Sequence, residues 1–428
     1  MGRRAIWTSI VPRIGLAMRI PTIEDWIRSC ENGHDDCAAN LSLCALPARI
    51  LDVGTDPPRL RHPDTAWAIE TDFGGRLQYC ALSHCWGESG VPLRTTHATI
   101  ASFEESIPFV TLPRTFQDAV TVARALGLRY LWIDSLCILQ DDGEDWNREA
   151  AKMADIFHGA YLTISASSAN NCHAGCLGEL LPHPAVQFDL PSGAKIFLHA
   201  DFLREAYHSV TLEGFPIHKR GWIFQEIFLS RRVVHITNEQ IYWQCRCLLE
   251  SEDQILSRIS EVDLVRLEDA SDAVKGRGLR STQRLTNVPL SGFQSLRQSP
   301  SGLNWWMLMR DHSSRALTFP KDSLPSLAGT VALWQRLAGD EPVLGMWKKE
   351  LPVHLSWLTR SQWEVQSQDL TMPSWTWFAI QPQSRKRSTS WGEAFLSLTT
   401  CTRTNGDLSR FCGWPTRSRL MYSGPTSP

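Results

Sequence analysis

The chain has 428 residues, more than a single hydrophobic core usually supports, so we expect two packed units. Hydrophobic residues make up 43% of the sequence and charged residues 21%, which excludes a mainly disordered chain. The formal net charge of −2 provides no basic field, so we expect neither nucleic acid nor an anionic membrane surface as a partner.

The first 20 residues do not resemble a targeting signal. The apolar run between Arg4 and Arg13 lacks the small-residue cleavage site of a secretory signal. Ile6 stands where a myristoylation motif has Ser or Thr. Because no apolar run approaches the length needed to span a bilayer, we expect a cytoplasmic protein without a membrane span.

Four regions differ in composition along the chain. Residues 1–78 are an irregular leader, with a helical pattern from Trp26 and an extended one over 46–53. Residues 79–255 form the main domain, whose core at 79–168 alternates strand and helix patterns. Residues 256–378 form a helical, Trp-rich region of mixed α+β character. Residues 379–428 gather Ser, Thr, Arg, Gly and Pro without periodicity, which predicts a poorly ordered tail.

The twelve cysteines are scattered rather than arranged as a disulfide framework. One group, spaced C-x3-H-x2-C-x6-C, consists of Cys30, His34, Cys37 and Cys44. A shorter group consists of Cys172, His173 and Cys176. Either group has ligand types that bind zinc, but neither has a standard spacing, so we assign no metal site and interpret both as ordinary thiols. Cys245 and Cys247 face one side of an expected strand and are interpreted as packing residues.

The core at 79–168 predicts a parallel sheet. Apolar strand patterns cover 79–84, 130–133 and 161–164. Helical patterns cover 96–105, 113–126 and 145–157. Strands that alternate with helices through short connections imply right-handed crossovers, so the expected fold class is α/β, with helices flanking a parallel core. Residues 220–243 predict a short helix and a hairpin that extends this sheet.

Polar side chains follow two of these strands where each strand ends. The first strand leads into Ser83, His84, Cys85 and Trp86. The second leads into Asp134, Ser135 and Cys137. Because ligands bind beyond the carboxyl ends of parallel strands, we expect a site at this edge of the sheet.

Glu149 lies in the helical pattern at 145–157 and is out of place there. It shares an apolar face with Trp146 and Met153, so its carboxylate should point towards the sheet. One interpretation is a catalytic carboxylate whose pKa is raised by desolvation. The other is a structural partner of an arginine, and the candidates are Arg94, Arg114 and Arg129.

Several segments resemble the fungal heterokaryon incompatibility (HET) domain. The first HET signature is matched by Tyr79–Gly87 (YCALSHCWG), and the second by Tyr130–Asp141 (YLWIDSLCILQD) with Asp145, Trp146 and Glu149. Later blocks are matched by Arg220–Glu226 (RGWIFQE) and Pro373–Trp377 (PSWTW), and the preceding segment by Trp26, Cys30, His34 and Cys37. Motifs this long at these spacings leave little room for coincidence.

The resemblance implies a fungal protein of vegetative incompatibility, in which fusion of unlike cells triggers death through protein partners or self-assembly. The HET fold is similar to the flavodoxin-like TIR domain, some members of which cleave NAD with a glutamate. That similarity implies a flavodoxin-like sheet, NAD as the candidate substrate, and Glu149, Ser83 and Asp134 as the candidate catalytic residues. Candidate ligand-binding residues are Trp86, His84, Cys85, Cys137, Arg220, Trp222 and Glu226. No G-x-G-x-x-G loop supports dinucleotide binding independently.

Two other chemistries fit the same segments. Cys85 or Cys137 with His84 and Asp134 has the composition of a thiol nucleophile set, although neighbours such as His84 and Cys85 should diverge. Asp134 with Asp141 and Asp142 could hold a divalent cation, but such acids usually cap a helix. The block at 220–232 is interpreted as structural, with Arg220 and Glu226 paired.

Three classes of function therefore remain open. The first is a cell-death signalling module, the second is a TIR-like NAD-cleaving hydrolase, and the third is a tailoring enzyme or accessory protein of a fungal secondary-metabolite cluster.

Overall fold

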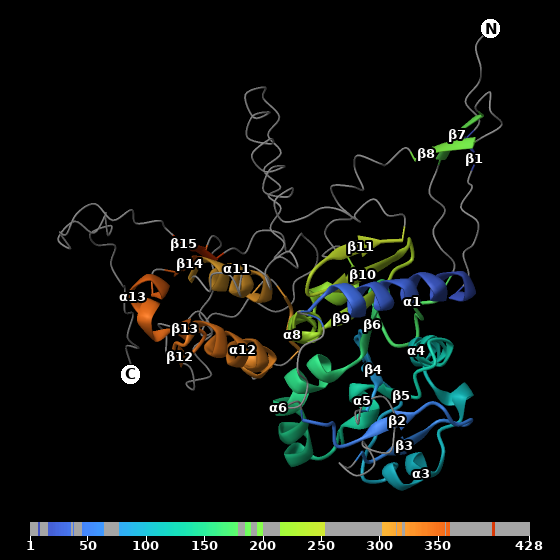
Figure 1. The fold of residues 1–428 in the computed structure, drawn as a ribbon. Helices are drawn as coiled ribbons and strands as arrows, with labels where there is room; N and C mark the ends of the chain where they lie inside the picture. Colours follow the sequence, from blue (N-terminus) through green and yellow to red (C-terminus); the bar gives the residue numbers. More distant parts are fainter. Residues whose placement is uncertain are drawn as a thin grey trace, which may run out of the picture.

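The computed structural model gives the fold of most of the chain (Figure 1). It describes residues 7–8, 16–35, 37, 45–63, 77–178, 185–189, 195–199, 215–252, 302–313, 315–318, 322–355, 357–359 and 396–398. Most of the predicted linker near 275–302 and of the predicted tail lies outside these residues. Within them, no helix is long and apolar enough to cross a membrane.

The centre of the molecule is an eight-stranded mixed sheet with the strand order β11-β10-β9-β6-β4-β5-β2-β3. Its four central strands run parallel and are β4 (Tyr79–Ser83), β5 (Tyr130–Trp132), β6 (Leu162–Ala166) and β9 (Arg232–Ile236). Antiparallel strands extend the sheet on both sides and are β2 (Ile50–Asp52), β3 (Arg59–Arg61), β10 (Ile241–Cys245) and β11 (Leu249–Ser251). The predicted α/β class and parallel core are thus confirmed.

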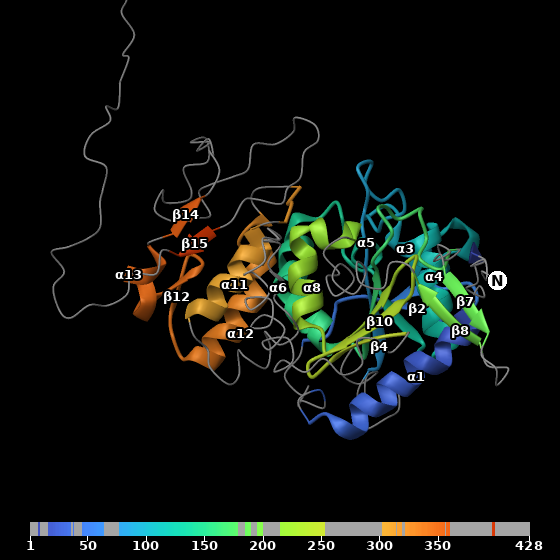
Figure 2. The same ribbon diagram turned by 90° about the horizontal axis from the view of Figure 1, so that it is seen from above.

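Numbered in chain order, the four parallel strands are arranged 2-1-3-4, which is the flavodoxin-like order. The crossover helices are α4 (Arg114–Ala125), α6 (Gly143–Gly159) and α8 (Gly221–Leu229). Helix α4 covers one face of the sheet, and α6 and α8 cover the other (Figure 2). The chain therefore changes faces between β4 and β6, and this is the topological switch point of the sheet.

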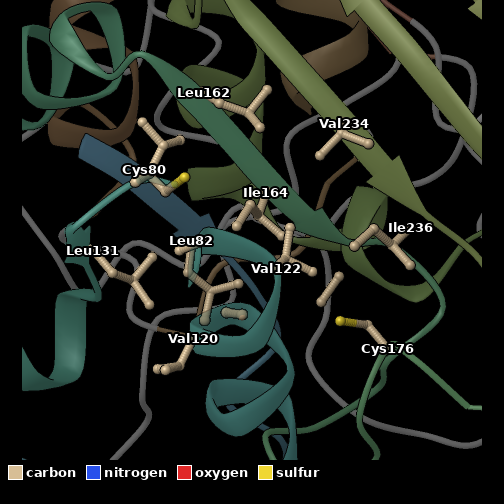
Figure 3. Close-up of a cluster of buried hydrophobic side chains, with 14 of the residues drawn as sticks. Cys80, Leu82, Val120, Val122, Leu131, Leu162, Ile164, Cys176, Val234 and Ile236 are labelled. Carbon is tan, nitrogen blue, oxygen red and sulfur yellow. The ribbon is translucent and has the colours of Figure 1, made fainter. Parts of the chain in front are cut away.

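Both faces of the parallel core are buried, as expected for strands covered by helices on each side. All five residues of β4 are buried, and the first four alternate between two hydrophobic clusters. On the α4 face, Leu82, Leu131 and Ile164 from neighbouring strands lie with Val120 and Val122 of the helix (Figure 3). On the other face, Trp132 and Phe157 meet edge to face with ring centroids 5.5 Å apart.

The leader adds further cover to the sheet. Helix α1 (Leu16–Gly33) begins earlier than the sequence pattern predicted and packs beside β10. Trp26 of α1 stacks on Trp243 of β10 with ring centroids 6.1 Å apart. Shorter elements of the main domain are α3 (Ile100–Glu105) and α5 (Asp134–Cys137). A separate small sheet joins β1 (Trp7–Thr8), β7 (Ala185–Asp189) and β8 (Lys195–His199).

The Trp-rich region packs against the outer side of α8. Its main helices are α11 (Gly302–Ser313), α12 (Ala328–Ala338) and the short α13 (Leu351–His354). Its strand pairs are β12 (Pro342–Val343) with β13 (Met346–Trp347), and β14 (Trp357–Thr359) with β15 (Leu396–Leu398). Trp305, Trp334 and Trp347 form one buried cluster that also contains Phe224 of α8. Helix α8 is consequently enclosed on both sides.

Gly329 marks a close approach between this region and the main domain. A Cβ atom added at Gly329 would lie 2.3 Å from Cβ of Ala154 in α6 and 2.8 Å from Cδ1 of Leu229. We expect Gly329→Ala to lower the free energy of unfolding by about 1–3 kcal/mol because of this overlap, despite the better helix propensity of Ala. Urea denaturation of both proteins measures the change. Gly143→Ala in α6 is the control, since its Cβ meets no atom within 4 Å; an equal effect of both substitutions would contradict this packing.

Candidate functional site

The candidate site lies at the carboxyl end of β4, beside the switch point. Ser83 is the last residue of β4 and lies opposite Ser165 of β6. Its hydroxyl donates a hydrogen bond of 2.6 Å to Oε2 of Glu226 in α8. Ser83 is fully buried and Glu226 is only 5% exposed. The structure thus joins a serine and a glutamate at the position where doubly wound sheets bind ligands.

Glu226 is a carboxyl group in an apolar setting. Its pKa is raised from 4.5 to about 7, mainly by burial and to a smaller extent by the nearby charge of Asp134. Arg220 and the Ser83 hydroxyl act in the opposite direction because they favour the ionised form. A carboxyl group with this pKa exchanges a proton near neutral pH, which is typical of functional sites.

Arg220 precedes α8 and connects this helix to β4. Its guanidinium donates a hydrogen bond to the carbonyl oxygen of His84. Burial lowers the pKa of His84 to about 4, although Asp134 opposes that change, so the imidazole is neutral at pH 7. The predicted pairing of Arg220 with Glu226 takes the form of a nearby charge, while the hydrogen bond to Glu226 comes from Ser83.

Asp134 begins α5 directly after β5 and completes the polar edge. Trp86 donates its indole N–H to Oδ2 of Asp134 at 2.8 Å, and the backbone N–H of Ser135 donates to Oδ1 at 2.7 Å. The Asp134 side chain is 21% exposed and its Oδ1 lies 3.9 Å from Nε2 of His84. Among the described residues, buried Nε2 of His84 and Oγ of Ser135 have no hydrogen-bond partner. This edge therefore presents two unmatched polar atoms beside a partly exposed carboxylate, which is consistent with a ligand site.

Glu149 is fully buried in α6 and is bound to the leader. It accepts a 2.9 Å hydrogen bond from the backbone N–H of Ala48 and forms a 2.9 Å ion pair with Lys152. Two of the three arginines proposed as its partners bind elsewhere, because Arg114 pairs with Asp118 and Arg129 with Asp52. The contacts of Glu149 are those of a structural carboxylate that fastens the leader to α6.

The two candidate thiol nucleophiles lie among apolar side chains. Burial raises the pKa of Cys85, which packs with Ile217 and Ile223. Burial also raises the pKa of Cys137 to about 12, and its sulfur accepts a bond from the backbone N–H of Ile133. Both groups are neutral thiols at pH 7, so this arrangement does not favour cysteine catalysis.

The remaining predicted residues have structural contacts. Asp142 is the N-cap of α6 and accepts bonds from the backbone N–H groups of Glu144 and Asp145. Asp141 accepts from the backbone N–H of His97. Trp222 of α8 donates its indole N–H to Asp322, at 3.1 Å, in the Trp-rich region. Among the described residues, one group has metal-ligand geometry and consists of Cys30, His34, Cys37 and Cys245, while Cys44 lies outside the described part of the chain.

Sequence reasoning proposed Glu226 as a ligand contact but did not find its bond to Ser83. A signal was present, because α8 reads Gly-Trp-Ile-Phe-Gln-Glu-Ile-Phe-Leu and a carboxylate in such an apolar helix must find a buried partner. Periodicity could not identify that partner, since both faces of α8 are apolar.

The comparison with known families agrees with this geometry. Residues 79–226 match the family described as heterokaryon incompatibility protein (HET). No curated protein and no solved structure matches the chain. The matched segment begins with β4 and ends at Glu226, so it contains Ser83, Asp134 and the whole polar edge. The chain therefore contains a heterokaryon incompatibility (HET) domain over residues 79–226.

Proposed function

We propose that this protein acts in fungal heterokaryon incompatibility, where recognition of a non-self partner leads to programmed cell death. The observation that carries this proposal is the HET match over residues 79–226, which includes three of the four parallel strands and the polar edge. Partner recognition or self-assembly of the HET domain would provide the trigger, and the Trp-rich region packed on α8 would hold the domain in one arrangement.

Expression in a living fungal cell tests this role. The full-length protein, placed under an inducible promoter, should reduce colony survival and admit a membrane-impermeant dye within hours of induction. The Ser83→Ala variant, expressed to the same level, should kill less efficiently because it loses the bond to Glu226. Sustained expression of folded protein without death, alone and after fusion with unlike strains, would contradict the proposal.

A second candidate function is hydrolysis of the nicotinamide–ribose bond of NAD. The observation that favours it is the buried Glu226 carboxyl, whose pKa is raised to about 7, beside the Ser83 hydroxyl. In its ionised form this carboxylate would stabilise the cation that develops on the ribose as the C–N bond breaks and its electron pair passes to nicotinamide. A water molecule then adds to the ribose carbon and gives its proton to the carboxylate.

The neighbouring groups would have distinct parts in such a reaction. The Trp86 ring could stack on the nicotinamide base, because an aromatic face suits a planar heterocycle. Asp134, half-buried beside Trp86, could accept a hydrogen bond from a ribose hydroxyl. We assign the catalytic carboxylate to Glu226 because of its bond to Ser83, and Glu149 remains the competing position.

A further inference from the structure

Four metal-ligand atoms from two distant parts of the chain converge beside α1. Cys30 lies in the last turn of α1, and His34 and Cys37 lie in the turn that follows. Cys245 lies at the end of β10, 211 residues beyond His34. The three sulfur atoms and a ring nitrogen of His34 all lie within 4.8 Å of one another. Cys30, Cys37 and Cys245 are buried.

The spacing of these atoms is compatible with a tetrahedral zinc site. With Zn–S bonds of about 2.3 Å and a Zn–N bond of about 2.0 Å, neighbouring ligand atoms in a tetrahedron are about 3.5–3.8 Å apart. The distance from Nδ1 of His34 to Sγ of Cys245 is 3.5 Å. Three thiolates and one imidazole are a common ligand set of structural zinc sites, all of whose coordination positions are filled by protein.

The surroundings of the four ligands also suit a bound cation with three thiolates. Three thiolates around a divalent zinc ion leave one negative charge, and buried Arg232 donates its Nε–H to Sγ of Cys30 at 3.3 Å. The backbone N–H of Cys247 points at Sγ of Cys245 at 3.4 Å. Such bonds orient ligand sulfurs and reduce their charge. The Cys247 sulfur lies 3.8 Å from that of Cys37, outside the four-atom group.

We propose that Cys30, His34, Cys37 and Cys245 bind a structural zinc ion. In the sequence, three of the ligands precede the HET segment at 79–226 and Cys245 follows it. The ion therefore fastens α1 to β10, two elements that are far apart in the chain. Since Arg231 also donates to the carbonyl of Cys37 at 3.4 Å, this turn is held from the sheet side as well.

Metal analysis of the full-length protein tests the site. Protein purified under reducing conditions without chelator should contain about one zinc per chain by elemental mass spectrometry. His34→Ala and Cys245→Ser should lose most of this zinc, whereas Cys172→Ser, which removes another buried thiol, should retain it. His34→Cys restores four ligands and should bind zinc again, which separates loss of a ligand from loss of folding.

Cobalt provides a second readout of the same site. After zinc removal, added Co²⁺ should produce thiolate charge-transfer absorption and the intense visible bands of tetrahedral coordination, and both should be absent from Cys245→Ser. Chelation of zinc should lower the melting temperature of wild type and leave that of His34→Ala unchanged. Protein that binds neither zinc nor cobalt, metal content unaffected by both ligand variants, or a disulfide from Cys37 to Cys245 or Cys247 would each overturn the proposal.

Discussion

Glu226→Gln is expected to abolish any hydrolytic activity of the HET domain while leaving the fold intact. The amide keeps the size of the side chain and an acceptor for the Ser83 hydroxyl, but it cannot ionise. If the carboxylate stabilises a cationic transition state, its removal should lower the turnover of NAD by about 100-fold or more. Wild-type turnover should rise as the pH increases through about 7, because the ionised form is the active one.

The contribution of Glu226 to stability should fall as the pH rises, whereas turnover should increase. The pKa of Glu226 rises on folding from 4.5 to about 7, so its favourable contribution is complete below 4.5 and is lost as the pH rises through 7. This pKa shift corresponds to a change of about 3 kcal/mol in the free energy of unfolding. Burial lowers the pKa values of His84 and His235 to about 4, so their contributions to stability are lost as the pH falls, not as it rises. The difference in melting temperature between wild type and Glu226→Gln therefore isolates Glu226, and the variant should gain relative stability from pH 5 to pH 8.

Glu149→Gln is the matched comparison for this experiment. It removes an equally buried charge, but from a carboxylate bound to Ala48 and Lys152. This variant should lose stability and keep NAD turnover. Turnover that falls with Glu149→Gln and survives Glu226→Gln would return the catalytic role to Glu149. Wild-type protein that never consumes NAD would exclude the enzymatic candidate and leave the proposed role in recognition.

The parallel core was predictable because its signals are local. The strand patterns at 79–84, 130–133 and 161–164 are short and mainly apolar, and helices with an apolar stripe separate them. The structure has strands and helices at these places, and the polar residues Ser83 and Asp134 lie at the predicted edge. The strand order was not predicted, because the right-handed crossover rule fixes the hand of each connection but not which strands lie side by side.

Partners across long sequence separations were not predictable from the same patterns. The extended segment at 46–53 does contain β2, but nothing in its sequence indicates antiparallel pairing with β5. The apolar stripe of α6 correctly predicted that Glu149 points inwards. Its hydrogen bond from the backbone N–H of Ala48 could not be predicted, because that bond depends on the path of the leader over α6. Likewise, the fourth member of the cysteine–histidine group is Cys245, which the spacing around Cys30 could not reveal.

Asp145→Asn in α6 is expected to cause a large loss of stability. Asp145 is 1% exposed and pairs with Arg49, which is itself buried in the leader just before β2. It also accepts a 2.8 Å bond from the backbone N–H of Leu139, and an Asn oxygen can still accept this bond. The substitution therefore leaves the Arg49 charge buried without its counterion, which should cost about 3–5 kcal/mol in the free energy of unfolding.

Three further variants show whether the loss comes from the buried charge pair. Asp142→Asn makes the same chemical change at the N-cap of α6, where Asn caps as well as Asp, so we expect almost no change in urea denaturation. Arg49→Met removes the cation, and the double variant Arg49→Met with Asp145→Asn should lose less stability than the two single losses added together. Additive losses, or an Asp145→Asn effect no larger than that of Asp142→Asn, would mean that the pair does not couple the leader to the HET domain. Strong coupling would make residues before 79 part of the folded unit on which the polar edge depends.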